Sequence, residues 1–219
     1  MKKRVTLFVA SALLLALTAV GCEKKREFGH RSPNNVISLP SQALQMLKDG
    51  NERFVNNELM PRTTNLADRK ILAEGQWPFA VVITCSDSRV SPELFFDQKQ
   101  GDLFVIRNAG NIADATALGS MEFAVEHLGA SLVAVVGHTG CGAVINAHAG
   151  AQGLSSNLQS VLDRVAENIT DSENAQAAKV DNVRSVIAAV SANEVVQKTQ
   201  AKVVGAIFDV STGAVTFLE

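Results

Sequence analysis

The fold is decided by two apolar runs, FAVVIT at residues 79–84 and SLVAVVG at residues 131–137. Both runs have the length of a strand and are rich in β-branched residues, which is typical of strands that are covered on both faces. Between them, residues 103–106 (LFVI) predict another buried strand and residues 114–128 predict a helix. Because strands and helices alternate, we expect a parallel sheet of the α/β class.

Helical patterns precede these strands. An apolar helical face runs from Leu44 to Val55, with Ser41 as its expected N-cap, and Gly50 interrupts it so that two helical pieces are possible. A shorter helix is expected at residues 66–74. We expect these segments to form an N-terminal helical arm.

The second half of the chain continues the alternation. Helices are expected at residues 141–147, 157–168 and 182–199. Residues 203–210 and 214–218 read as two strands joined by a turn that contains glycine. The predicted fold class is therefore α/β, with a mainly parallel central sheet flanked by helices and a C-terminal hairpin.

The start of the chain reads as an export signal. Basic residues at positions 2–4 precede an apolar stretch, 5–20, that carries no charge. Residues 18–22 (TAVGC) resemble a bacterial lipoprotein cleavage box. We therefore expect a signal peptide at residues 1–21 and lipidation of Cys22; the alternative is a plain secreted protein with a stray cysteine.

The composition suits one globular domain after a short tether. Of the 219 residues, 47% are apolar and 19% are charged. We expect residues 22–40 to be a polar tether and residues 41–219 to be the folded domain. Removing residues 1–21 takes away three basic side chains and no acidic one, which changes the net charge from −2 to −5. Nothing in this balance indicates a nucleic-acid partner.

Export also predicts the location. We expect an exported protein on the periplasmic face of a bacterial membrane, where its only membrane contact is the N-terminal lipid on Cys22.

Three residues of the types that bind zinc follow the predicted strands. Cys85 follows the first strand and His138 follows the later one, and in open α/β sheets such strand ends gather functional side chains. Cys141 lies three positions after His138, and Gly140 allows a tight turn between them. A His-x-x-Cys pair alone is weak evidence, but together with Cys85 it predicts one Zn²⁺ per chain with a fourth position for water.

Asp87 and Arg89 follow the first of these cysteines closely. A bidentate ion pair between them is sterically plausible, and it would keep the carboxylate ionised. Asp87 could then accept a hydrogen bond from a zinc-bound hydroxide. The alternative is an ordinary ion pair on a surface turn.

These motifs resemble a known family. The sequences CSDSR at residues 85–89 and HTGCGA at residues 138–143 look like the paired signature of β-class carbonic anhydrases, and the resemblance extends from about Leu44 to Leu218. It implies that residues 41–219 are a catalytic domain that hydrates CO₂ reversibly to bicarbonate and a proton.

The resemblance also implies residue roles. Zinc would be held by Cys85, His138 and Cys141, and Asp87 and Arg89 would act as the catalytic dyad. The substrate pocket is expected to include Gln76, Phe104, Ala109, Phe123 and Gly142. Phe123 stands where relatives often carry tyrosine. Val82 stands where members with a regulatory bicarbonate site carry tryptophan, which argues against that form of control.

Two further expectations concern assembly and pH. The family resemblance implies a homodimer or a larger homo-oligomer, with the N-terminal helix wrapped around the partner and the active site at the subunit interface. Two thiolates already neutralise the charge of a divalent zinc, so hydration should become faster toward alkaline pH.

Three other functions remain open on the residues alone. The same zinc site could hydrolyse carbonyl sulfide or carbon disulfide. The chain could instead be a non-catalytic zinc-binding lipoprotein. Export into an oxidising compartment would also permit a redox protein with a Cys85–Cys141 disulfide.

Overall fold

The computed structural model describes residues 37–61, 64–169 and 172–218. The expected signal peptide, the lipidation site Cys22 and most of the expected tether lie outside the described residues. Among the residues that are described, no helix is long and apolar enough to cross a membrane.

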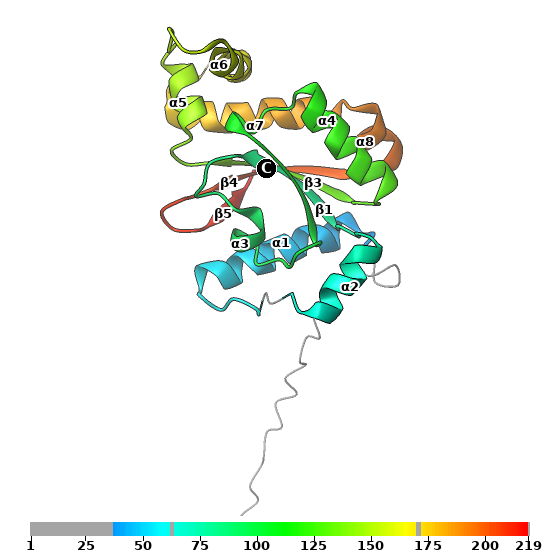
Figure 1. Ribbon diagram of the computed structural model, residues 1–219. Coiled ribbons are helices and arrows are strands. Elements are labelled where there is room, and N and C mark those ends of the chain that lie inside the picture. The colour runs from blue at the N-terminus through cyan, green and yellow to red at the C-terminus, as the bar shows by residue number, and fades with distance from the viewer. Residues whose placement is uncertain (1–36, 62–63, 170–171, 219) are drawn as a thin grey trace, which may run out of the picture.

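A five-stranded sheet forms the centre of the molecule, in the order β2-β1-β3-β4-β5 (Figure 1). The first four strands are parallel, and the last is antiparallel to β4. The strands are β1 (Ala80–Cys85), β2 (Leu103–Asn108), β3 (Leu132–His138), β4 (Lys202–Phe208) and β5 (Val215–Phe217). This confirms the predicted α/β class and the C-terminal hairpin. Every residue of β1 and β3 is buried, as their unbroken apolar runs indicated.

Helices cover both faces of the sheet (Figure 1). On one side lie α1 (Pro40–Val55), α2 (Leu66–Glu74) and the short α3 (Pro92–Phe95), which the sequence analysis did not predict. The other helical elements are η1 (Ala109–Asn111), α4 (Ala115–Glu122), the π-helical η2 (Phe123–His127), α5 (Gly142–His148), α6 (Ser156–Asn168), α7 (Ala175–Ser191) and α8 (Glu194–Thr199).

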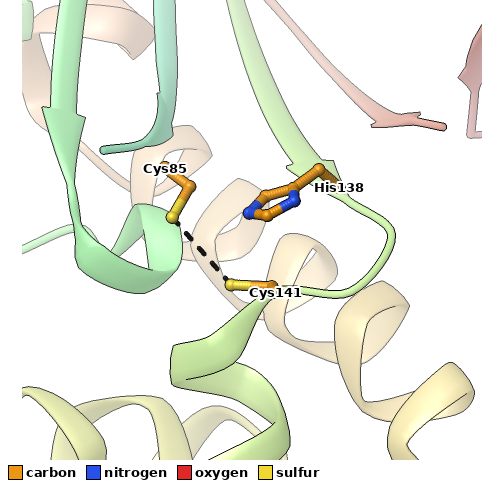
Figure 2. A group of neighbouring side chains, drawn as sticks. All are labelled: Cys85, His138 and Cys141. Atoms are coloured by element: carbon orange, nitrogen blue, oxygen red, sulfur yellow. Dashed lines mark hydrogen bonds between the residues drawn. The ribbon is translucent and has the colours of Figure 1, made fainter. Parts of the chain in front are cut away.

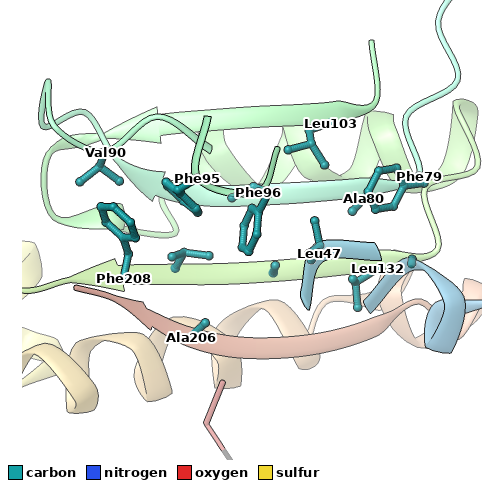
Figure 3. Close-up of a cluster of buried hydrophobic side chains, with 14 residues drawn as sticks. Leu47, Phe79, Ala80, Val90, Phe95, Phe96, Leu103, Leu132, Ala206 and Phe208 are labelled. Carbon is teal, nitrogen blue, oxygen red and sulfur yellow. The ribbon is translucent and has the colours of Figure 1, made fainter. Parts of the chain in front are cut away.

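An aromatic core fastens α1 and α3 to the sheet (Figure 3). Phe95 stacks on Phe208 with 4.4 Å between the ring centroids, and Leu47 of α1 is fully buried in the same cluster. Burying large apolar side chains of this kind contributes roughly 1.5–3 kcal/mol each. This packing holds α3 and the turn before it against the carboxyl edge of the sheet.

The N-terminal helix differs from its prediction in two ways. It is one continuous helix through Gly50, and its N-cap is Leu39 rather than Ser41, because Pro40 occupies the first turn. Gly50 is present for packing and not as a break: a Cβ there would lie 1.8 Å from the backbone oxygen of Phe96.

We therefore expect Gly50→Ala to destabilise the protein by about 1–3 kcal/mol, because the backbone of α3 must move. The matched control is Gly119→Ala in α4, where a Cβ meets nothing within 4 Å. The control should stabilise the fold by up to about 1 kcal/mol through helix propensity. Urea unfolding of both variants measures the difference, and equal effects would contradict the packing role of Gly50.

The helix expected at residues 182–199 is in fact two helices. The first, α7, already begins at Ala175, where the side chain of Asn174 accepts hydrogen bonds from two backbone N–H groups of the first turn. Asn193 then caps a separate helix, α8, by accepting from the Val195 N–H. The prediction was wrong at this point because capping by asparagine overrides a continuous apolar pattern.

Candidate metal centre

The carboxyl edge of the sheet brings three metal-binding side chains together. Cys85 is the last residue of β1 and His138 is the last residue of β3, and these strands are parallel neighbours. Gly140, at φ 67°, makes the turn that places Cys141 at the N-cap of α5. Figure 2 shows the three side chains pointing toward one another from these elements.

The geometry of this cluster suits a tetrahedral zinc ion. The two sulfur atoms lie 3.9 Å apart, and the donor atoms of all three residues lie within 4.8 Å of one another. Two thiolates on one zinc, each at about 2.3 Å, would have their sulfurs about 3.8 Å apart. The observed sulfur spacing therefore matches shared coordination.

His138 presents the nitrogen that a metal needs. Its Nδ1 lies 3.0 Å from the carbonyl oxygen of Thr139, which can only accept, so Nδ1 carries the hydrogen. Its Nε2 is buried and has no hydrogen-bond partner within the part of the chain that the structure describes. A buried acceptor left without a donor costs free energy, and a cation between this nitrogen and the two sulfurs would remove that cost.

The sulfur atoms are placed to be anionic. The two sulfurs interact directly: the hydrogen bond between them lowers the pKa of Cys85, whereas this bond and burial raise the pKa of Cys141. The backbone of Gly110 and of Asp87 also lowers the pKa of Cys85, and the backbone of the first turn of α5 opposes the rise in the pKa of Cys141. A cation would allow both sulfurs to be thiolates.

Asp87 and Arg89 form the bidentate pair that the sequence suggested. Arg89 donates from Nε to Asp87 Oδ1 at 2.9 Å and from Nη2 to Oδ2 at 2.7 Å. These bonds hold the pKa of Asp87 well below its usual range, so the carboxylate stays ionised at any ordinary pH. Arg89 also donates to the carbonyl oxygen of Gly140 at 3.2 Å, which ties the pair to the turn before Cys141.

Sequence reasoning assigned no role to Arg107, which fixes the same turn from β2. Its Nε donates to the carbonyl oxygen of Cys85 at 3.1 Å, and its Nη2 donates to that of Asp87 at 2.7 Å. The signal was its position: Arg107 pairs with Thr84 in the parallel register, so a long side chain there can cross the end of β1. This role could not be predicted from the sequence, because it depends on the register between β1 and β2.

The residues expected in the substrate pocket fall into two groups. Ala109 follows Asn108, the register partner of Cys85, and Gly142 adjoins Cys141, so both lie next to the metal cluster. Phe104 instead pairs with Val81, about 13 Å along the strand from the level of Cys85. Its ring lies 6.4 Å from that of Phe123.

Gln76 also lies away from the cluster of its own chain. It precedes the amino end of β1, whereas Cys85 is the last residue of that strand. A single chain therefore does not bring Gln76, Phe104 or Phe123 to the metal cluster, and their roles in substrate binding stay predictions.

Comparison with known proteins gives consistent matches. The family model described as carbonic anhydrase matches residues 80–215. The carbonic anhydrase of Mycolicibacterium smegmatis is 40% identical over 147 residues, which cover 66% of this chain and 71% of that protein. Carbonic anhydrase 2 of Mycobacterium tuberculosis is 48% identical over 105 residues, which cover 48% of this chain and 51% of that protein. The chain thus spans only about half the length of this second relative.

A solved structure agrees with these matches. The β-carbonic anhydrase CafA of the fungal pathogen Aspergillus fumigatus superimposes with a TM-score of 0.63 at 30% identity. The superposition covers 82% of this chain and 90% of that one.

Proposed function

This chain belongs to the β class of the carbonic anhydrase family, and we propose that it catalyses the reversible hydration of CO₂ to bicarbonate and a proton. The observation that carries the proposal is the convergence of one imidazole nitrogen and two sulfurs beside an ionised carboxylate. A purely structural zinc site would be closed by a fourth protein ligand and would not need the carboxylate.

In this proposal Cys85, His138 and Cys141 hold one zinc ion per chain. When bound, zinc would supply an acidified water, whose pKa falls from about 15.7 toward neutrality, as the nucleophile for CO₂. Residues of this chain orient the nucleophile and hold the turn that carries the site. Asp87, kept ionised by Arg89, can accept a hydrogen bond from the nucleophile and so orient it, while Arg107 holds the turn that carries both Cys85 and Asp87.

The direct test uses the full-length, zinc-loaded protein in stopped-flow CO₂ hydration, with hydrolysis of carbonyl sulfide and carbon disulfide measured in parallel. We expect CO₂ to be the fastest substrate. Faster turnover of either sulfur compound would favour the alternative substrate class on the same site. Bound zinc without turnover of any of the three would favour the non-catalytic zinc-binding lipoprotein.

A redox function has less support from the geometry. Both cysteines are free thiols, and their sulfurs lie 3.9 Å apart, almost twice the bond length of a disulfide at about 2.05 Å. Counting free thiols in the zinc-loaded and the zinc-free protein distinguishes a redox protein with a disulfide from the zinc enzyme.

We expect CO₂ hydration to become faster between pH 6 and pH 9. Two thiolates reduce the Lewis acidity of zinc, so the nucleophile should form at a higher pH than in a site with three imidazoles. Asp87 is not the source of the change: its pKa is lowered by Arg89, so it is fully ionised throughout that range. A rate that is flat from pH 6 to pH 9 would contradict this expectation.

We further propose a homodimer or larger homo-oligomer that completes the site across a subunit interface. The support is twofold. Gln76, Phe104 and Phe123 lie away from the metal cluster of their own chain. In addition, α2 has no buried residue, and it leaves Leu66 61% and Ile71 37% exposed.

The double variant Leu66→Glu/Ile71→Glu should therefore shift the protein toward monomers and lower CO₂ hydration. Light scattering coupled to size exclusion measures the mass. Leu158→Glu in α6 is the matched control, because Leu158 is also exposed, at 45%, but lies on a different helix. A change in mass for the control alone would place the interface elsewhere.

Export as a lipoprotein remains a proposal that rests on residues 1–22. Labelled palmitate should be incorporated by the wild-type chain and lost in Cys22→Ser. Incorporation that persists in the variant would contradict lipidation of Cys22.

A further inference from the structure

The loop that joins two of the proposed ligands, His138 and Cys141, is not held by packing at its centre. Gly140 lies there, and a Cβ on it would meet no atom of the described chain within 4 Å. Side-chain contacts at this glycine therefore do not fix the direction of the peptides beside it. The loop needs other contacts to hold the ring of His138 toward the two cysteines, as Figure 2 shows it.

Thr139 supplies three such contacts. Its backbone N–H donates to the carbonyl oxygen of Phe208, at the end of β4, at 3.0 Å. Its hydroxyl oxygen accepts from the backbone N–H of Val210 at 3.0 Å. Its own carbonyl oxygen accepts from Nδ1 of His138 at 3.0 Å. Thr139 is thus bound at two points to the segment that ends β4, and it binds the imidazole ring at a third.

The segment that Thr139 binds is itself firmly placed. In the turn after β4, the Asp209 N–H donates to the carbonyl oxygen of Ala214, and the Gly213 N–H donates to that of Asp209, both at 2.8 Å. Asn51 of α1, which is buried, donates from Nδ2 to the carbonyl oxygen of Gly213 at 2.8 Å. Because the turn is held by these bonds, the Thr139 hydroxyl is bonded to a fixed point.

We propose that Thr139 is a positioning residue of the metal centre: its hydroxyl, bonded to Val210, fixes the peptide whose carbonyl oxygen orients the ring of His138. The inference rests on the zinc site of the proposed function and names a residue that determines how this site holds its metal. Loss of an outer partner of a ligating histidine typically changes metal affinity or activity by about 10–100-fold. The hydroxyl acts one bond further out, so we expect about 10-fold.

A general contribution to stability is the competing explanation, and Thr212 is the matched control for it. Its hydroxyl oxygen also accepts a backbone N–H of the turn after β4, that of Ala214, at 3.3 Å. Its own N–H donates to the carboxylate of Asp209 at 3.2 Å. Within the part of the chain that the structure describes, neither bond involves a residue of the metal cluster. Thr139→Ser is a second comparison, because it keeps the hydroxyl and removes only a methyl group.

The experiment compares Thr139→Val, Thr139→Ser and Thr212→Val in the full-length protein. Zinc affinity is measured by competition with a chelator, and NMR of the zinc-loaded protein follows exchange of the His138 Nδ1 hydrogen with water. Both valine variants should lose stability, because each leaves a backbone N–H without its acceptor. Only Thr139→Val should bind zinc more weakly, by about 10-fold, and exchange that hydrogen faster. Thr139→Ser should match the wild type in both measurements.

Two results would overturn the proposal. The first is a Thr139→Val variant with the zinc affinity and hydrogen exchange of the wild type. The second is a loss of zinc affinity in Thr139→Ser as large as that in Thr139→Val, because the hydroxyl would then not be responsible.

Thr139→Ala keeps the inference testable if Thr139→Val does not fold. The smaller side chain leaves room for a water molecule on the Val210 N–H, but that water is not attached to the loop. Its zinc affinity should therefore also lie about 10-fold below that of Thr212→Val. An affinity equal to that of this control would overturn the role of Thr139.

The outcome is separable from that of the proposed function. A wild-type protein that binds zinc but does not hydrate CO₂ would end the proposed function, while the zinc affinities would still decide the role of Thr139. Full CO₂ hydration by the wild type, with a zinc affinity that does not depend on the Thr139 hydroxyl, would end only this inference.

Discussion

Cys85→Ser is expected to reduce zinc content and CO₂ hydration together, by more than about 100-fold. That exceeds the 10–100-fold cost of losing an outer partner of a metal site, because here a ligand itself is lost. Serine has nearly the size of cysteine, but its hydroxyl does not ionise near neutral pH and is a poor ligand for zinc. The buried β1 should tolerate the change, so the variant should fold.

The measurements are zinc per chain by elemental analysis, stopped-flow CO₂ hydration, and circular dichroism to verify folding. Ser88→Ala is the matched control, because Ser88 is exposed in the same turn and carries none of the functional groups assigned here. Wild-type rates in Cys85→Ser would end the proposed mechanism. Loss of activity in both variants would show that the turn, and not the ligand, is the sensitive feature.

Asp87→Asn is expected to lower CO₂ hydration by about 10²–10³-fold while zinc stays bound. This loss of rate is typical of removing a positioned side chain that exchanges a proton or accepts a hydrogen bond in the reaction. Asparagine keeps the shape of the side chain but has no charge to pair with Arg89, and its amide can present an N–H where the carboxylate offered a lone pair. Metal content should remain at the wild-type level, because Asp87 is not one of the three clustered ligands.

Asp209→Asn provides the control for this second prediction. Asp209 is another turn carboxylate whose pKa is lowered, in this case by hydrogen bonds from Ser211 and Thr212. Its replacement should leave the rate within about twofold of wild type, as for a surface change. If Asp87→Asn lost its zinc, the loss of activity would reflect the metal site and not the orientation of the nucleophile.

The sequence by itself determined the strands and the chemistry of the site. Buried parallel strands require unbroken apolar, β-branched runs, and such runs are visible locally, so β1 and β3 were predicted within one residue at each end. The site residues at 85–89 and 138–141 could also be predicted, because each group forms a short local motif next to one of these strands. Their spacing places them directly after strands, and parallel strands end at one edge of a sheet.

Only the tertiary structure decided the contacts that depend on register and packing. Arg107 reaches the carbonyl oxygens of Cys85 and Asp87 because of the pairing between β1 and β2, and Asn182 reaches Gly110 across 72 positions of the chain. Similarly, the sequence pattern predicts a helix break at Gly50, whereas the structure shows that the backbone of Phe96 packs against this glycine. These contacts join residues that no local pattern relates, because they arise from the way whole elements pack and not from the periodicity within any one of them.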